Sequence, residues 1–298
     1  MGNGLALGRI VPGGRLLGVA LTCAGIAALS HAVPRLVSTD PKRINRAVFG
    51  AWYEEDIYDR FCAGAPLAMR GFRRRIPQAM RDRNLIFVHV PRAAGTSIAR
   101  TLYGAGCIRH HSMRYYQALD PVFAKAADSF ALLRDPFDRF ASAFAFIRSG
   151  GTSICRLSEV FLRQTEYVKS VDDYLSFLEG RGPLDLDFVM RPQSWFVSDP
   201  ATGAPLVKTL FLYGEDEGAL AAYLAPQGIG GLPWLNRAPR GALLLNDRQR
   251  DRVERLYAAD FALIESVRAA RECGWRPVPH RRDGGGIVGF LRTPTRSS

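Results

Sequence analysis

The sequence places one guanidinium and two hydroxyls close together, at Arg92, Thr96 and Ser97, and such groups bind anions. They follow an apolar run, Leu85–Val90, that has the length and the Ile, Phe and Val content of a buried strand. Pro91 ends this strand because proline cannot donate to a central ladder. A short loop then leads into a helix that begins near Thr96. The amides of such a loop and of the first helical turn point at one spot, so we predict a cradle for a nucleotide phosphate.

A second segment of similar chemistry lies between residues 130 and 146, FALLRDPFDRFASAFAF. Here an apolar strand ends in Arg134, a turn follows at Asp135, and a helix begins near Phe137. Arg134 can fork onto a phosphate, and the hydroxyl of Ser142 can complete the contacts. The local alternative is that Asp135 caps the helix and Arg134 pairs with a neighbour. The first cradle favours the phosphate interpretation.

The obvious class of protein with such a cradle is the P-loop nucleoside triphosphatases. Its signature needs Gly-x4-Gly-Lys-Ser/Thr, with the lysine on the phosphates and the hydroxyl on magnesium. The sequence contains no Gly-Lys-Ser/Thr, and Arg92 precedes Gly95 instead of following it. We therefore disfavour a magnesium-dependent kinase and retain the phosphate cradle.

The two segments together resemble the sulfotransferases that use PAPS (3′-phosphoadenosine 5′-phosphosulfate), and in particular the carbohydrate branch with its heparan-type, chondroitin-type and bacterial members. Members of that branch carry a Pro-Lys-Thr-Gly-Gly-Thr-Ser loop and an Arg-Asp-Pro-x-x-Arg-x-x-Ser helix start. Three later segments are also similar to it, so the likeness runs from about Asn84 to Leu263: FVMRPQSWF at 188–196, LYGED at 212–216 and LYAADFAL at 256–263.

The resemblance implies an enzyme that moves a sulfuryl group from PAPS to a hydroxyl of a carbohydrate or glycolipid acceptor. The reaction releases PAP (3′-phosphoadenosine 5′-phosphate) and needs no metal. The resemblance implies that Arg134 and Ser142 bind the 3′-phosphate. It also assigns the 5′-phosphosulfate to five residues of the first loop: Arg92, Ala94, Gly95, Thr96 and Ser97. One departure is that Arg92 stands where the family usually has lysine. Arginine stabilises charge on the leaving oxygen, but it is a poor proton donor.

A base must take the proton of the acceptor hydroxyl, and histidine suits this near neutral pH. The resemblance points to the segment between the two motifs, which contains His110 and His111, and we favour His111. Glu55 or Asp56 is the alternative, and His89 is expected to be a buried histidine with satisfied ring nitrogens. By resemblance, two further residues line the acceptor pocket: Gln193 and Trp195.

Two other classes of function stay open at this point. One is a catalytically inactive member of the same fold that binds a nucleotide or a glycan, and the other is a P-loop-like kinase. The net charge of +12 and the pI near 9.9 suit a polyanionic ligand or an anionic membrane surface. The basic residues are scattered along the chain, which argues against a nucleic-acid partner.

Three apolar runs, at 85–90, 129–133 and 206–213, alternate with helical patterns. This order predicts an α/β fold, a P-loop-like doubly wound parallel sheet flanked by helices, with the ligand at the carboxyl ends of the strands. Ser170 is expected to cap a helix over residues 170–179, and Asn246 to cap one long helix, Asp247–Arg268.

We predict three regions along the 298 residues: an apolar N-terminal segment (1–45), a sulfotransferase domain (46–275) and a loose basic tail (276–298). Residues 16–33 carry no formal charge, and three interpretations of them stay open: a packed helix, a membrane anchor and a cleaved signal peptide. The five cysteines form no paired motif, which favours reduced thiols. The expected location is a cytoplasmic catalytic domain, held at a membrane if residues 16–33 span it.

Overall fold

The computed structural model describes residues 40–61, 75–104, 109–152, 155–229, 243–275 and 277. The predicted anchor at residues 16–33 and nearly all of the basic tail lie outside these ranges. Within them, no helix combines the length and the hydropathy that a bilayer crossing requires.

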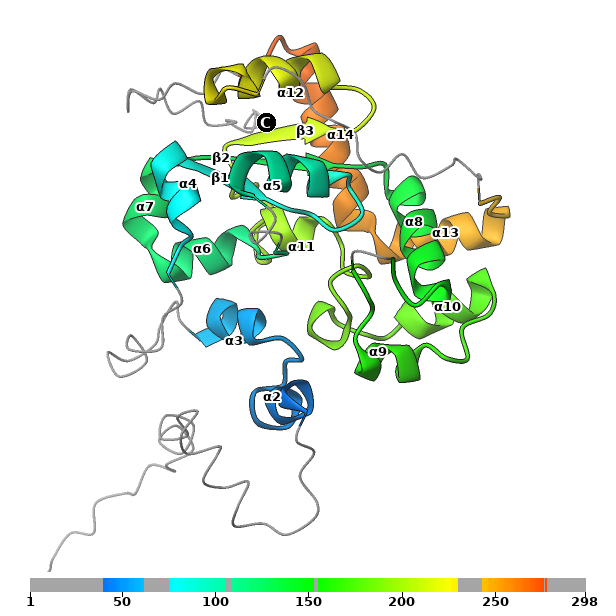
Figure 1. Cartoon of the computed structure of the whole chain (residues 1–298). Helices are drawn as coiled ribbons and strands as arrows, with labels where there is room; N and C mark the ends of the chain where they lie inside the picture. The colour runs from blue at the N-terminus through cyan, green and yellow to red at the C-terminus, as the bar shows by residue number, and fades with distance from the viewer. Residues whose placement is uncertain are drawn as a thin grey trace, which may run out of the picture.

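A three-stranded parallel sheet forms the centre of the chain (Figure 1). Its strands are β1 (Leu85–Val88), β2 (Asp128–Leu133) and β3 (Thr209–Leu212), and β2 lies in the middle. The register pairs Leu85 with Asp128 and Phe130 with Thr209. Nearly every strand residue is buried, as expected for apolar runs covered on both faces. The three predicted strands are therefore confirmed, with β1 and β3 shorter than their apolar runs.

Helices surround this sheet, so the predicted α/β class is confirmed in its coarser form (Figure 1). The three described strands lie in the sheet in the same order as in the chain, so this part shows no point at which the strand order reverses. The finer prediction, a doubly wound P-loop-like sheet, therefore stays a prediction.

The helices fall into two groups around two hydrophobic cores. The first core contains the sheet and the helices packed around it: α4 (Gln78–Arg83), α5 (Gly95–Tyr103), α6 (Met113–Leu119), α7 (Pro121–Ala126), α11 (Ser194–Val197), α12 (Glu217–Leu224) and α14 (Ala258–Glu272). The second core lies among α8 (Pro136–Arg148), α9 (Glu159–Gln164), α10 (Val171–Leu178) and α13 (Asp247–Leu256). Two further described helices, α2 (Pro41–Phe49) and α3 (Glu54–Phe61), come before α4 in the chain.

The helix predicted over Asp247–Arg268 is two helices, α13 and α14, so the prediction of one continuous helix is wrong. Asn246 caps the first, as expected, and accepts from the N–H of Gln249 at 2.9 Å. The break falls at Tyr257, whose φ is −116°. The buried Tyr257 hydroxyl donates to the Met190 carbonyl at 2.8 Å, so this residue is held by a partner distant in the sequence.

Tyr103 ties the end of α5 to the outer side of β1. Its hydroxyl donates to the Leu85 carbonyl at 2.8 Å and accepts from the Phe87 N–H at 3.0 Å. Both backbone groups face away from β2, because alternate residues of a strand bond to opposite sides. One side chain thus occupies a donor and an acceptor on the outer side of β1.

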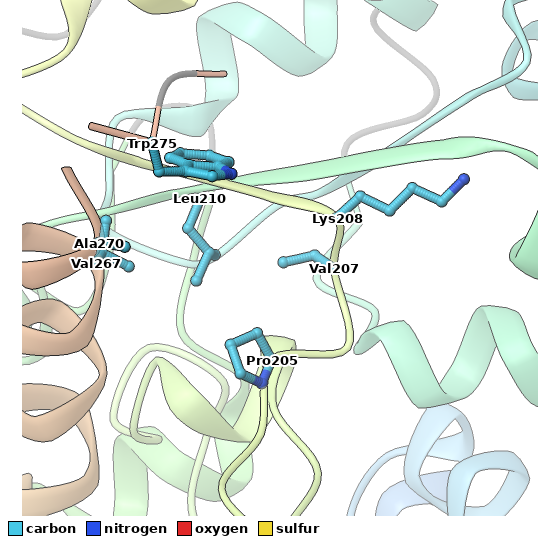
Figure 2. Close-up of a pocket in the computed structure, with 7 residues that line it drawn as sticks. All are labelled: Pro205, Val207, Lys208, Leu210, Val267, Ala270 and Trp275. Atoms are coloured by element: carbon cyan, nitrogen blue, oxygen red, sulfur yellow. The ribbon is translucent and has the colours of Figure 1, made fainter. Parts of the chain in front are cut away.

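A small, mostly apolar pocket lies where β3 begins, beside α14 (Figure 2). It is lined by Pro205, Val207, Lys208, Leu210, Val267, Ala270 and Trp275. The strands are parallel, so this is the end of the sheet opposite to the loops that follow β1 and β2.

Candidate functional site

The loop that follows β1 has an unusual backbone. Arg92 and Ala94 both adopt the left-handed conformation, with φ of 66° and 63°. This conformation is uncommon outside glycine and turns successive N–H groups toward one side. Ala94 is the residue before α5 and offers no capping side chain, so the first N–H groups of α5 receive no side-chain cap from it. This backbone is compatible with an anion cradle, and the binding of an anion by the loop stays a prediction.

Gly95 is required here because the ring of His89 lies against it. A Cβ atom at position 95 would lie 2.3 Å from His89 Cδ2 and 2.9 Å from Phe87 Cζ. His89 is buried, and its Nδ1 has no hydrogen-bond partner among the described residues. The expectation of satisfied ring nitrogens is thus wrong for this atom. Burial, with His110 nearby, holds the pKa of His89 well below its ordinary value.

The two predicted anion-binding segments meet in the structure. Arg92 donates from Nε and from Nη2 to the hydroxyl oxygen of Ser142, at 3.0 Å and 2.8 Å. Ser142 lies on α8, 50 positions further along the chain. The contact follows from the topology, because parallel neighbours β1 and β2 deliver their following loops to the same edge of the sheet.

Positive charge is concentrated at this edge. Among the described residues, no carboxylate pairs with Arg92. Burial, then Arg134 and Arg139, lower the pKa of Arg92, so each of these two guanidinium groups is near enough to repel that of Arg92. Arg139 is 1% exposed and donates from Nε to the Pro91 carbonyl at 3.0 Å. An anionic ligand would relieve this repulsion.

Arg134 directly follows β2, as predicted. Its guanidinium lies 3.6 Å from the Asp138 carboxylate and 5.5 Å from the centre of the Tyr213 ring. Asp135 caps α8 by accepting the N–H groups of Phe137 and Asp138. The local interpretation of this motif is therefore also realised, and it leaves the Arg134 side chain 21% exposed.

His110 and His111 occupy different surroundings. His110 Nδ1 lies 3.0 Å from the His89 carbonyl, and the two rings are 4.4 Å apart. Burial lowers the pKa of His110 from 6.5. His111 is 8% exposed, packs on Tyr115 with ring centres 4.0 Å apart, and has Nε2 3.6 Å from Glu55 Oε1. His110 therefore contacts His89, whose ring lies against Gly95, whereas His111 lies beside Glu55 and Tyr115.

Aromatic side chains extend from His110 toward α3. Phe188 has its ring centre 6.2 Å from that of His110 and 3.9 Å from that of Tyr53. Beneath them, the fully buried Arg191 forms two 2.7 Å hydrogen bonds with Asp56. Asp56, one alternative for the base, is therefore engaged in an ion pair.

Gln193 and Trp195 were predicted to line the acceptor pocket, and the structure places them differently from each other. Trp195 on α11 is half-buried, and the Arg114 guanidinium lies 4.4 Å from its ring centre. Gln193 is fully buried, and its amide contacts the backbone of Arg134. The Asp260 carboxylate, whose pKa is raised by burial, accepts from the backbone of Gln193.

The sequence does not reveal that Gln193 and Asp260 hold the backbone beyond β2. Arg139 is expected from the sequence to add positive potential at the second motif, but its hydrogen bond to the Pro91 carbonyl is not predicted. A signal for a buried partner is present, because Arg139 stands within an apolar helix where burial demands a polar partner. In the described residues, no cluster of three His, Cys, Asp or Glu side chains is arranged to hold a metal ion.

No protein-family model matches the chain, and it matches neither a curated protein nor a solved structure.

Proposed function

We propose that this protein is a PAPS-dependent sulfotransferase that acts on a carbohydrate hydroxyl, built on a P-loop-like doubly wound sheet. The observation that supports it best is the double hydrogen bond between Arg92 and Ser142. It joins a left-handed loop to the helix that follows Arg134. Two anion-binding elements in contact suit a nucleotide with phosphates at both its 5′ and 3′ positions.

In the proposed reaction, the acceptor oxygen attacks the sulfur of PAPS and the bond from sulfur to the bridging phosphate oxygen breaks. The electron pair of that bond remains on the phosphate of PAP, where Arg92 stabilises the developing negative charge. Arg92 acts as a fixed cation and donor and keeps its proton, because arginine stays charged in proteins.

We assign the proton acceptor to His110. A carbonyl only accepts hydrogen bonds, so the contact with the His89 carbonyl places the proton of neutral His110 on Nδ1. Nε2 then carries the lone pair that a base needs. His111 is the alternative assignment, and its Nε2 lies 3.6 Å from the Glu55 carboxylate.

The pH dependence of kcat/KM tests this assignment. Burial lowers the pKa of His110 from 6.5, so His110 is neutral at pH 7 and gains its proton only as the pH falls. We expect activity to be flat near neutrality and to decline with a midpoint below pH 6.5. His110→Ala should abolish this acidic limb, and His111→Ala should retain it. The opposite pattern would assign the base to His111.

Calorimetric titration with PAP tests the first step of the proposal. Full-length protein is expected to bind PAP without added magnesium, and more tightly than 5′-AMP, because only PAP carries the 3′-phosphate. Transfer of labelled sulfate from PAPS to a panel of glycans then separates an enzyme from an inactive binding protein. Absence of PAP binding would refute the proposal, and magnesium-dependent ATP turnover would favour a kinase.

A further inference from the structure

The side-chain amide of Gln193 forms hydrogen bonds with both backbone groups of Arg134, as the backbone of a neighbouring strand would. Its Oε1 accepts the Arg134 N–H at 2.9 Å, and its Nε2 donates to the Arg134 carbonyl at 2.7 Å. Gln193 has no exposed surface. Both backbone groups of Arg134 are thereby fixed just beyond the last residue of β2. A primary amide is the side chain that can satisfy a donor and an acceptor in this way.

Gln193 is itself held by a buried carboxylate on another helix. Asp260 of α14 accepts the N–H of Gln193 at 2.7 Å and the N–H of Ser194 at 2.8 Å. Asp260 has no exposed surface, so these bonds form away from water. Figure 1 shows α14 running beside the sheet, and α11 packs against it. A continuous set of hydrogen bonds therefore joins α14 to the end of β2.

The head group of Arg134 has much weaker support than its backbone. Its side chain makes no hydrogen bond within the described residues, and Nε is buried without a partner. The carboxylate of Asp138, whose side chain is 64% exposed, is 3.6 Å away. The guanidinium also lies 5.5 Å from the centre of the Tyr213 ring, so hydrogen bonds within the described residues fix the backbone of Arg134 and not its head group.

We propose that Gln193, oriented by Asp260, is a positioning residue that makes the site selective for a nucleotide with a 3′-phosphate. This inference rests on the proposed function, in which Arg134 receives that phosphate. Gln193 would set the backbone of Arg134 so that its guanidinium meets the phosphate with its donors aligned. Contacts of the first loop with the 5′ side of the nucleotide would be independent of Gln193.

The experiment compares affinities for PAP and 5′-AMP in wild-type protein and in Gln193→Met, which keeps the volume of the side chain and removes both hydrogen bonds. We expect the preference for PAP over 5′-AMP to fall by about tenfold or more, with the affinity for 5′-AMP within about twofold of wild type. Asp260→Asn should lower the same preference, because its amide group would face a backbone N–H. If Gln193→Met does not fold, Asp260→Asn alone provides the comparison.

Gln227→Met is the matched control, because Gln227 is also a buried glutamine and accepts from Arg83 at 3.3 Å in another part of the structure. This variant is expected to keep the wild-type preference for PAP even if its melting temperature falls. Equal preference in Gln193→Met and wild type would overturn the inference and leave the proposed function standing. If the wild-type protein does not distinguish PAP from 5′-AMP, the proposed function fails instead.

Discussion

Replacement of Arg92 by alanine is expected to lower the rate of sulfuryl transfer by about a hundredfold to a thousandfold, the usual loss when one preorganised donor to a developing anion is removed. Arg92 is half-buried and has no carboxylate partner among the described residues, so its charge is available to the ligand. The same variant also removes both hydrogen bonds that the Arg92 guanidinium donates to Ser142. Single-turnover measurement with labelled PAPS reports the chemical step directly.

Arg92→Lys distinguishes charge from geometry. Lysine restores a cation at the position where the resembled family carries one, but it cannot donate two parallel hydrogen bonds to Ser142. We expect this variant to recover activity to within about tenfold of wild type, since charge is the larger contribution.

The control for both Arg92 variants is Arg163→Ala, which removes the same charge from an exposed ion pair with Glu159 on α9. It should change the rate by less than about twofold, because exposed pairs contribute little. Equal rates in Arg92→Ala and wild type would exclude Arg92 from the reaction.

The second large effect concerns stability. Asp56→Ala is expected to lower the free energy of unfolding by about 3–5 kcal/mol, because it leaves the Arg191 charge buried without its partner. Arg191 has no exposed surface, and Asp56 is 4% exposed. The guanidinium also lies under the Phe188 ring, 4.5 Å from its centre. Urea unfolding followed by circular dichroism measures the change.

The double variant Asp56→Leu/Arg191→Met supplies the control, since it removes both charges and fills the space with apolar side chains. It should be more stable than Asp56→Ala, as is common when a buried pair is replaced as a unit. A double variant less stable than Asp56→Ala would show that Arg191 stabilises the fold chiefly through its contacts with the aromatic rings.

The local elements were predictable because their signals are local. The apolar runs at 85–90 and 129–133 predicted β1 and β2, and Ser170 caps α10 as expected, with Asp173 completing a capping box. The break at Tyr257 was not predictable from helical spacing, because its hydroxyl bonds to a carbonyl 67 positions away. Periodicity describes one face of a helix and carries no information about such a partner.

The same division applies to the candidate site. The residues that open each loop, Arg92 and Arg134, stand out by type and position beside strand ends. The residues that hold those loops do not, because Gln193 and Asp260 act on backbone groups 59 and 67 positions away. Gln193 was assigned to the acceptor pocket by resemblance, and its position in the structure depends on how α11 and α14 pack, which only the tertiary fold specifies.

The hydroxyl of Tyr103 has a consequence for how molecules of this protein meet one another. An outer strand with unpaired N–H and C=O groups is a template onto which a strand of another chain can add, and this is a common route to aggregation. On β1, the Tyr103 hydroxyl occupies the carbonyl of Leu85 and the N–H of Phe87. Within the part of the chain that the structure describes, β1 is an outer strand, and an incoming strand would have to displace this ring from a buried position before it could pair at Leu85 and Phe87.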